Sequence, residues 1–126
     1  MNLFEVGDDV YGLLMHEPSV TWYLGDKVFP LVANAKTEYP FAVYRRVSYS
    51  RDGDNKDGYG GERCTMDIAI VDPSYSKSVE IAKAVTKCLI EGSTNDIEKI
   101  ELSNASEDFI DDANVQRLTF TITLTE

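Results

Sequence analysis

The sequence predicts one α+β domain spanning residues 1–126, with a mainly antiparallel sheet and two helices packed on one of its faces. Helical patterns are few: one opens the chain and a second, strongly amphipathic one covers residues 79–89. Elsewhere apolar residues mostly alternate with polar ones, as they do in half-buried strands. The expected order of elements along the chain is α-β-β-β-α-β-β. Because two of these strands form a hairpin, we expect mainly antiparallel pairing.

The first helix is predicted from its capping residues and its apolar face. Asn2 can cap its start, and Glu5 follows three residues later, as in a capping box. We expect Pro18 to end it, because the residue before a proline avoids the α region. The apolar residues recur at helical spacing: Leu3, Val6, Val10, Leu13 and Leu14.

Three strands are predicted next, and the last two form a long hairpin. The first is short and lies around Lys27–Phe29; the others run from Tyr39 to about Ser50 and from Cys64 to Val71. Strict alternation places two sets of residues on single strand faces: Phe41, Val43, Val47 and Tyr49 on the first hairpin strand, and Cys64, Met66, Ile68 and Ile70 on its return.

The second half of the chain is predicted as one helix and two strands. Gly92 is placed to end the helix, and a weaker strand covers Ile97–Leu102. Residues 103–114 are polar and acidic and are expected to form a loop. The last strand, Leu118–Leu124, alternates apolar residues with threonines. The buried stripe of the helix is expected to contain Ile81, Ala82, Val85, Cys88 and Leu89.

Composition excludes several classes of protein. The net charge is −10 and the pI is near 4.5, so a dedicated nucleic-acid surface is not expected, because that requires clustered lysine and arginine. No apolar run approaches the roughly 20 residues that span a bilayer, and the N-terminus lacks the basic and apolar regions of a signal peptide. Two cysteines, Cys64 and Cys88, fit buried small hydrophobes in a reducing compartment; a bridge between them stays open.

Catalytic and cofactor motifs are missing from the sequence. The only histidine, His16, is expected to interact with the last carbonyls of the first helix. The acidic run from Asp52 does not fit an EF-hand in any register, which leaves only a loose, non-EF calcium site as an alternative. Adjacent carboxylates such as Asp8–Asp9 are interpreted as solvated charge. We therefore predict no enzyme, no cofactor and no metal site.

The connection between the hairpin strands is the candidate functional segment. Residues 51–61 contain four glycines, several charges and no aliphatic residue. Hairpin connections usually have two to five residues, and a longer one adds ordering entropy without adding to a core. We therefore expect another polypeptide chain to hold this assembly loop. Its candidate contact residues are Arg51, Asp52, Asp54, Asn55, Lys56, Asp57 and Tyr59.

The order and spacing of several weak landmarks resemble the tail-completion and tail-terminator proteins of long-tailed bacteriophages. They are an N-terminal helix, Val28-Phe29-Pro30, the strand Tyr39–Tyr44 with its extended loop, the run Val71–Tyr75 before an amphipathic helix, and a two-stranded finish. The resemblance covers most of the chain.

This resemblance implies a structural protein of a phage or prophage that forms a ring, expected to be a hexamer. The ring would cap the tail tube and join it to the head. Its partners would be copies of itself, the tail-tube protein and head–tail connector proteins, with DNA passing through the ring. It would act in the virion tail after assembly in the host cytoplasm. The alternatives are a small intracellular adaptor domain without catalytic activity and a hydrolase with an unrecognised carboxylate site.

Overall fold

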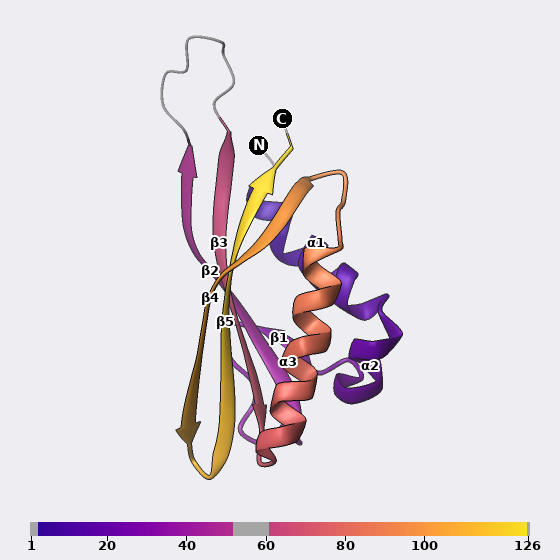
Figure 1. Cartoon of the computed structure of the whole chain (residues 1–126), viewed down its shortest axis with the longest axis vertical. Helices are drawn as coiled ribbons and strands as arrows, with labels where there is room; N and C mark the ends of the chain where they lie inside the picture. Colours follow the sequence, from indigo (N-terminus) through magenta and orange to yellow (C-terminus); the bar gives the residue numbers. More distant parts are fainter. Residues whose placement is uncertain (1–2, 52–60, 126) are drawn as a thin grey trace.

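The computed structural model, which describes residues 3–51 and 61–125, is a five-stranded sheet with its helices on one face (Figure 1). The strand order is β1-β2-β3-β5-β4. β1 runs parallel to β2, and all other neighbours are antiparallel. The elements are a 3-10 turn at Leu3–Glu5, α1 (Val6–Met15), α2 (Pro18–Leu24), β1 (Val28–Pro30), β2 (Phe41–Arg51), β3 (Glu62–Asp72), α3 (Tyr75–Ile90), β4 (Ile97–Ile110) and β5 (Ala113–Leu124).

The α+β class is confirmed, but the prediction of two helices is wrong. The first helix does end before Pro18, and Glu17 is extended as predicted, but a second helix, α2, begins at Pro18 itself. At this first helical position the missing N–H is no loss, and the fixed φ suits the helix. The carboxylate of Glu17 caps α2 by accepting a hydrogen bond from the Ser19 N–H at 3.3 Å. Gly25, at φ 59°, ends it. None of the helices in the described ranges is long and apolar enough to cross a membrane.

The first helix follows its predicted face. Val6, Val10 and Leu14 are fully buried, and Leu13 packs against the core from a partly exposed position. α1 ends at Met15, and His16 Nδ1 lies 2.7 Å from the carbonyl oxygen of Gly12, which confirms the role expected for this histidine. The predicted cap, Asn2, lies outside the described residues.

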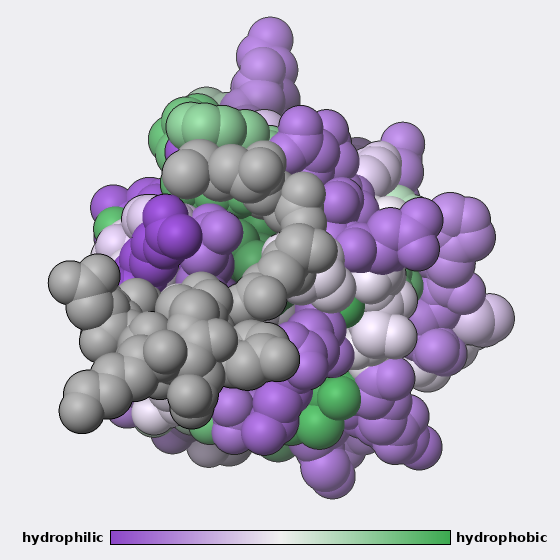
Figure 2. All heavy atoms as spheres, turned by 90° about the horizontal axis from the view of Figure 1, so that it is seen from above, coloured by the Kyte–Doolittle hydropathy of each residue, from purple (hydrophilic) through white to green (hydrophobic). Residues whose placement is uncertain are grey.

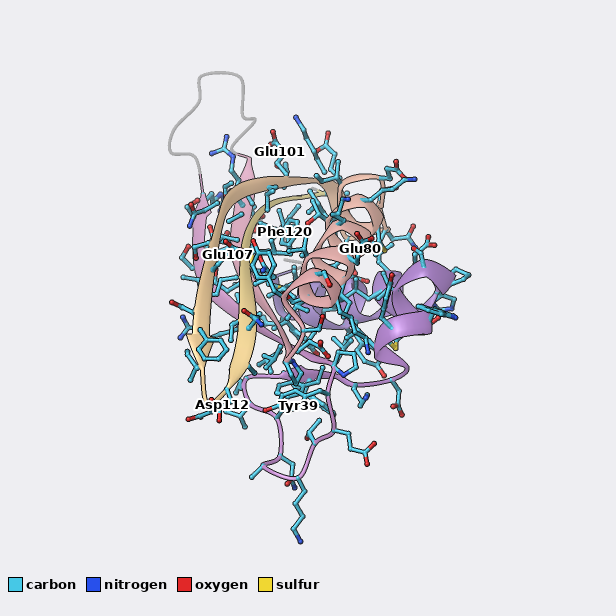
Figure 3. The ribbon with its side chains drawn as sticks, turned by 60° about the horizontal axis from the view of Figure 1, so that its bottom comes forward. Tyr39, Glu80, Glu101, Glu107, Asp112 and Phe120 are labelled. Atoms are coloured by element: carbon cyan, nitrogen blue, oxygen red, sulfur yellow. The ribbon has the colours of Figure 1, made fainter. Side chains whose placement is uncertain are left out.

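The core lies between the sheet and the three helices. The predicted apolar faces of β3 and β5 are buried, and so is the predicted stripe of α3 except for Cys88, which is partly exposed. Phe120, at the centre of β5, is fully buried beneath α3 (Figure 3). The remaining central residues come from both layers: Met66, Ile68, Ile70, Ile81, Val85, Leu89, Ile122 and Leu124.

The face assignment for β2 is wrong beyond its middle. The pairing of β2 with β3 shifts between Arg46 and Ser48, so Val47 is an extra, bulged residue. A bulge of one residue reverses the alternation that follows it. Tyr49 therefore packs against the core together with Ala42 and Tyr44, and not on the face of Phe41.

The loop predicted for residues 103–114 is also wrong. β4 continues to Ile110 and reaches β5 through a two-residue turn at Asp111 and Asp112, whose φ values are 52° and 63°. Positive φ at both central residues is the geometry of a type I′ turn, which matches the twist of a hairpin. This region has no apolar alternation because both faces of β4 are exposed from Glu101 to Ile110.

Candidate assembly surfaces

Of the predicted assembly-loop residues, the structure describes only Arg51. It is the last residue of β2, is exposed, and lies opposite Glu62 of β3. Asp52, Asp54, Asn55, Lys56, Asp57 and Tyr59 lie outside the described residues, so their role stays a prediction.

The strands on either side of that loop are joined at its base. The Tyr49 hydroxyl donates to Glu62 Oε2 at 2.7 Å across the β2–β3 pair. This hydrogen bond to a carboxylate is the main reason why the pKa of Tyr49 is raised. The described part of the hairpin therefore keeps its own pairing up to Arg51 and Glu62. The end of the molecule that carries the loop presents mostly hydrophilic side chains, with apolar ones in separate patches (Figure 2).

Both edges of the sheet are open over much of their length. β4 forms one edge along all of its residues. At the other edge, β1 covers only residues 42–44 of β2 and leaves residues 45–51 without a strand partner on that side, within the described part of the chain. An exposed strand edge presents unpaired backbone N–H and C=O groups and is a template for pairing with another chain.

The two open edges carry opposite charge. The open part of β2 has three arginines and no acidic residue; β4 has four acidic residues and one lysine. These side chains are exposed, and those of β4 include Glu101 and Glu107 (Figure 3). The charged residues are Arg45, Arg46 and Arg51 on β2, and Glu98, Lys99, Glu101, Glu107 and Asp108 on β4.

The far half of the β4–β5 hairpin is held to the domain by polar contacts. Gln116 Nε2 donates to Glu107 Oε2 at 2.9 Å and lies 3.3 Å from Ser78 Oγ on α3. Arg117 Nε donates to Asp108 Oδ2 at 2.6 Å. Hydrogen bonds from Tyr75 and Gln116 lower the pKa of Glu107. These contacts and the pairing of β5 with β3 as far as Asn114 hold the end of the hairpin to the domain, and its tip exposes apolar side chains, among them Phe109 at 66%.

The face of the sheet away from the helices has a shallow polar centre. Asp67 accepts a hydrogen bond from Thr119 Oγ1 at 2.7 Å, and Arg45 lies 3.8 Å from its other oxygen. A hollow of about 300 Å³ is lined by Leu31, Val43, Arg45, Asp67, Ala69 and Arg117. All three charged residues of this lining are already paired, Arg45 with Asp67 and Arg117 with Asp108.

A larger crevice of about 620 Å³ lies beside α1 and the end of α3, and Asp9 is one of the residues that line it. The pKa of Asp9 is raised to about 6, first because burial disfavours its charged form and then because Asp96 lies beside it. The two residues are far apart in sequence, and only the packing of α1 against the segment before β4 brings them together. The interpretation of Asp9 as solvated charge is therefore wrong.

The thiol that lines the crevice is not activated for nucleophilic attack. Both cysteines are free thiols; Cys88, which lines the crevice, has a pKa raised to about 11 by burial and neighbouring carboxylates, and its Sγ donates to the Leu13 carbonyl at 3.3 Å. A thiol in this state is a poor nucleophile. Across the described residues, no three His, Cys, Asp or Glu side chains are grouped to hold a metal ion.

Comparison with solved structures shows that other proteins share this fold. A chain in the virion of a native gene transfer agent particle superposes with a TM-score of 0.78, at 14% identity over 93% of this chain and 92% of that one. A second solved chain superposes with a TM-score of 0.59, at 12% identity over 100% of this chain and 97% of its own. No curated protein is significantly similar in sequence.

The family of the protein is shown by its amino-acid sequence. A model of the family described as tail completion protein gp17 matches residues 8–125, nearly the whole chain. The protein therefore belongs to this tail completion family, which confirms the resemblance found in the sequence and gives the chain a structural role in the phage tail.

Proposed function

We propose that this tail completion protein forms a ring, expected to be a hexamer, that caps the tail tube and joins it to the head. The observation that carries the proposal is the family match over residues 8–125. The arrangement of the surface supports it. A ring requires two different surfaces on each subunit that bind head to tail, and this domain has two open sheet edges of opposite charge.

The proposed partners are copies of this chain, the tail-tube protein and head–tail connector proteins. The assembly loop, residues 51–61, connects β2 to β3 and is proposed to contact a neighbouring subunit or the tube. The tip of the β4–β5 hairpin lies at the opposite end of the molecule (Figure 1). A subunit with a proposed contact segment at each end is suited to join two different components.

The net charge of −10 suits a passage for DNA, because acidic walls repel phosphates. We propose an acidic lumen on this ground. A map of the assembled ring would test it, and a strongly basic inner wall would contradict it.

Electron microscopy of the purified protein, with and without recombinant tail tubes of the same phage, tests the ring itself. We expect one ring at a single end of each tube, and tubes of uncontrolled length when the protein is omitted during assembly. A protein that stays monomeric with tubes present and leaves tube length unchanged would contradict the proposed function.

A further inference from the structure

The directions of the strands allow the two open edges to pair between copies of the chain. β2, β3, β5 and β4 are successive antiparallel neighbours, so β2 and β4 run in opposite directions. In a ring whose axis lies roughly along the strands, all subunits share one orientation. The β2 edge of one subunit then meets the β4 edge of the next as an antiparallel pair.

The sheet register shows which residues lie at the same height. At one end of the sheet, Arg51 of β2 is opposite Glu62 of β3. Ile97, at the start of β4, is opposite Leu124 of β5, which lies at the same end of the sheet as Glu62. Further along β2, away from the loop, one row of the sheet contains Arg45 of β2, Asp67 of β3, Thr119 of β5 and Asn104 of β4. Residues 45–51 of β2 are therefore level with residues 97–104 of β4.

Charge selects this pairing over the symmetric ones. Pairing β4 with β4 would bring two strands with four acidic residues each together, and pairing β2 with β2 would bring two arginine-rich edges together. Like charges directly opposite each other destabilise a strand pair, whereas opposite charges stabilise it. In the β2–β4 combination Arg51 is level with the start of β4, next to Glu98, and Arg45 is level with Asn104, two rows from Glu101.

We propose that the open edge of β2, residues 45–51, pairs antiparallel with residues 97–104 of β4 in a second copy of this chain. The sheets of the subunits would then join into one continuous sheet around the ring. This inference rests on the proposed ring. β1 sets the limit of the contact, because it occupies the β2 edge at residues 42–44.

Charge reversal with rescue tests the pairing. One variant carries Arg45→Glu and Arg51→Glu, a second carries Glu98→Lys and Glu101→Lys, and a third carries all four changes. Matched controls with the same changes in net charge are Lys83→Glu with Lys87→Glu, and Glu80→Lys with Glu91→Lys, all at exposed positions of α3 or its end. The readout is the fraction of recombinant tail tubes that carry a ring.

We expect each single-edge variant to lower that fraction about tenfold and the four-change variant to restore it to within about twofold of wild type. The controls should match wild type, and circular dichroism should show that every variant is folded. The edge pairing would be overturned if both single-edge variants assembled fully, or if the folded four-change variant failed to assemble. In either case the proposed function would still stand, provided that the wild-type protein forms rings. Absence of wild-type rings would overturn both.

A cysteine cross-link gives a second, direct measurement. Ser48 and Glu101 lie in one row of the sheet, through Thr65 and Thr121. In rings mixed from Ser48→Cys and Glu101→Cys subunits, we expect disulfide-linked dimers on oxidation. Rings of either variant alone should give no disulfide-linked dimers. Wild-type rings, whose subunits contain only Cys64 and Cys88, should also give none. Cross-linking within rings of one variant alone would indicate a symmetric contact and would contradict the proposal.

Discussion

The carboxyl group of Asp9 is held in the folded protein at an energetic disadvantage, which makes its removal a sharp test of the structure. Asp9 lies on α1 and is partly buried beside Asp96; its Oδ2 atom is buried without a hydrogen-bond partner among the described residues. Burial and the neighbouring carboxyl raise its pKa from 3.8 to about 6. We predict that Asp9→Asn stabilises the protein at neutral pH.

The magnitude follows from the change in pKa. A rise from 3.8 to about 6, at ~1.4 kcal/mol per pH unit, corresponds to about 3 kcal/mol. Because the side chain is only partly buried, solvent screens part of this. The new amide also has to satisfy its own hydrogen bonds. We therefore expect Asp9→Asn to gain about 1–2 kcal/mol in unfolding free energy at pH 7.5.

The pH dependence gives the sign of the effect. The folded state binds the Asp9 proton more tightly than the unfolded state, so this group lowers the unfolding free energy as pH rises from about 4 through about 6. The difference between variant and wild type should be small near pH 4, grow across that window and be constant above pH 7. Urea denaturation of both proteins at a series of pH values measures it.

Asp8→Asn is the matched control, because it removes the same charge from an exposed neighbour on the same helix. Asp8 contributes only in a minor way to the Asp9 pKa, so we expect little gain, offset by loss of a favourable charge near the start of α1. A gain for Asp9→Asn that is equal at pH 4 and pH 7.5, or a net loss at pH 7.5, would refute the reasoning.

Three further predictions concern the two hairpins and the core. Replacing residues 52–60 by a single asparagine forms an Asn-Gly turn with Gly61, and should leave a folded domain by thermal unfolding while tube-bound rings are lost; loss of the fold would contradict the assembly role of the loop. Phe120→Ala should lower the unfolding free energy by about 3–5 kcal/mol, because Phe120 is fully buried; Phe109→Ala, at an exposed position, should change it by less than about 0.5 kcal/mol, and equal effects would refute the assigned burial. Asp111→Asn with Asp112→Gly should raise the unfolding free energy by about 0.5–1 kcal/mol, because both residues have positive φ; a lowered urea midpoint would argue against the type I′ turn.

Burial explains which parts of the fold could be predicted from the sequence. β3, β5 and α3 each place one face in the core, so Met66, Phe120 and Val85 appear at the spacing of their element. α2 was missed because it is only seven residues long and Pro18 resembles a stop signal. The bulge at Val47 leaves no mark in the alternation of β2.

The candidate surfaces were less predictable for a related reason. Asp9 and Asp96 are joined only by tertiary packing, so no spacing in the sequence connects them. The edges of the sheet depend on strand order, which the sequence does not state. The assembly loop is predicted from its length and composition, and its role stays a prediction; the family match bears out only the structural class of the protein.

β4, whose second half resembles a loop in the sequence, is also the strand that we propose to lie between subunits. These two properties have one cause. A strand shows alternation only where its own chain buries one of its faces. From Glu101 to Ile110, β4 buries neither face, and its outer backbone groups face away from β5. Such an edge would be prone to indiscriminate pairing in a free monomer, and charged side chains are the usual protection. The acidic residues of β4 serve that purpose, and they still permit pairing with an edge rich in arginine. An assembly strand of this kind is therefore recognised by its charge and by its partner edge, and not by the periodicity of its own sequence.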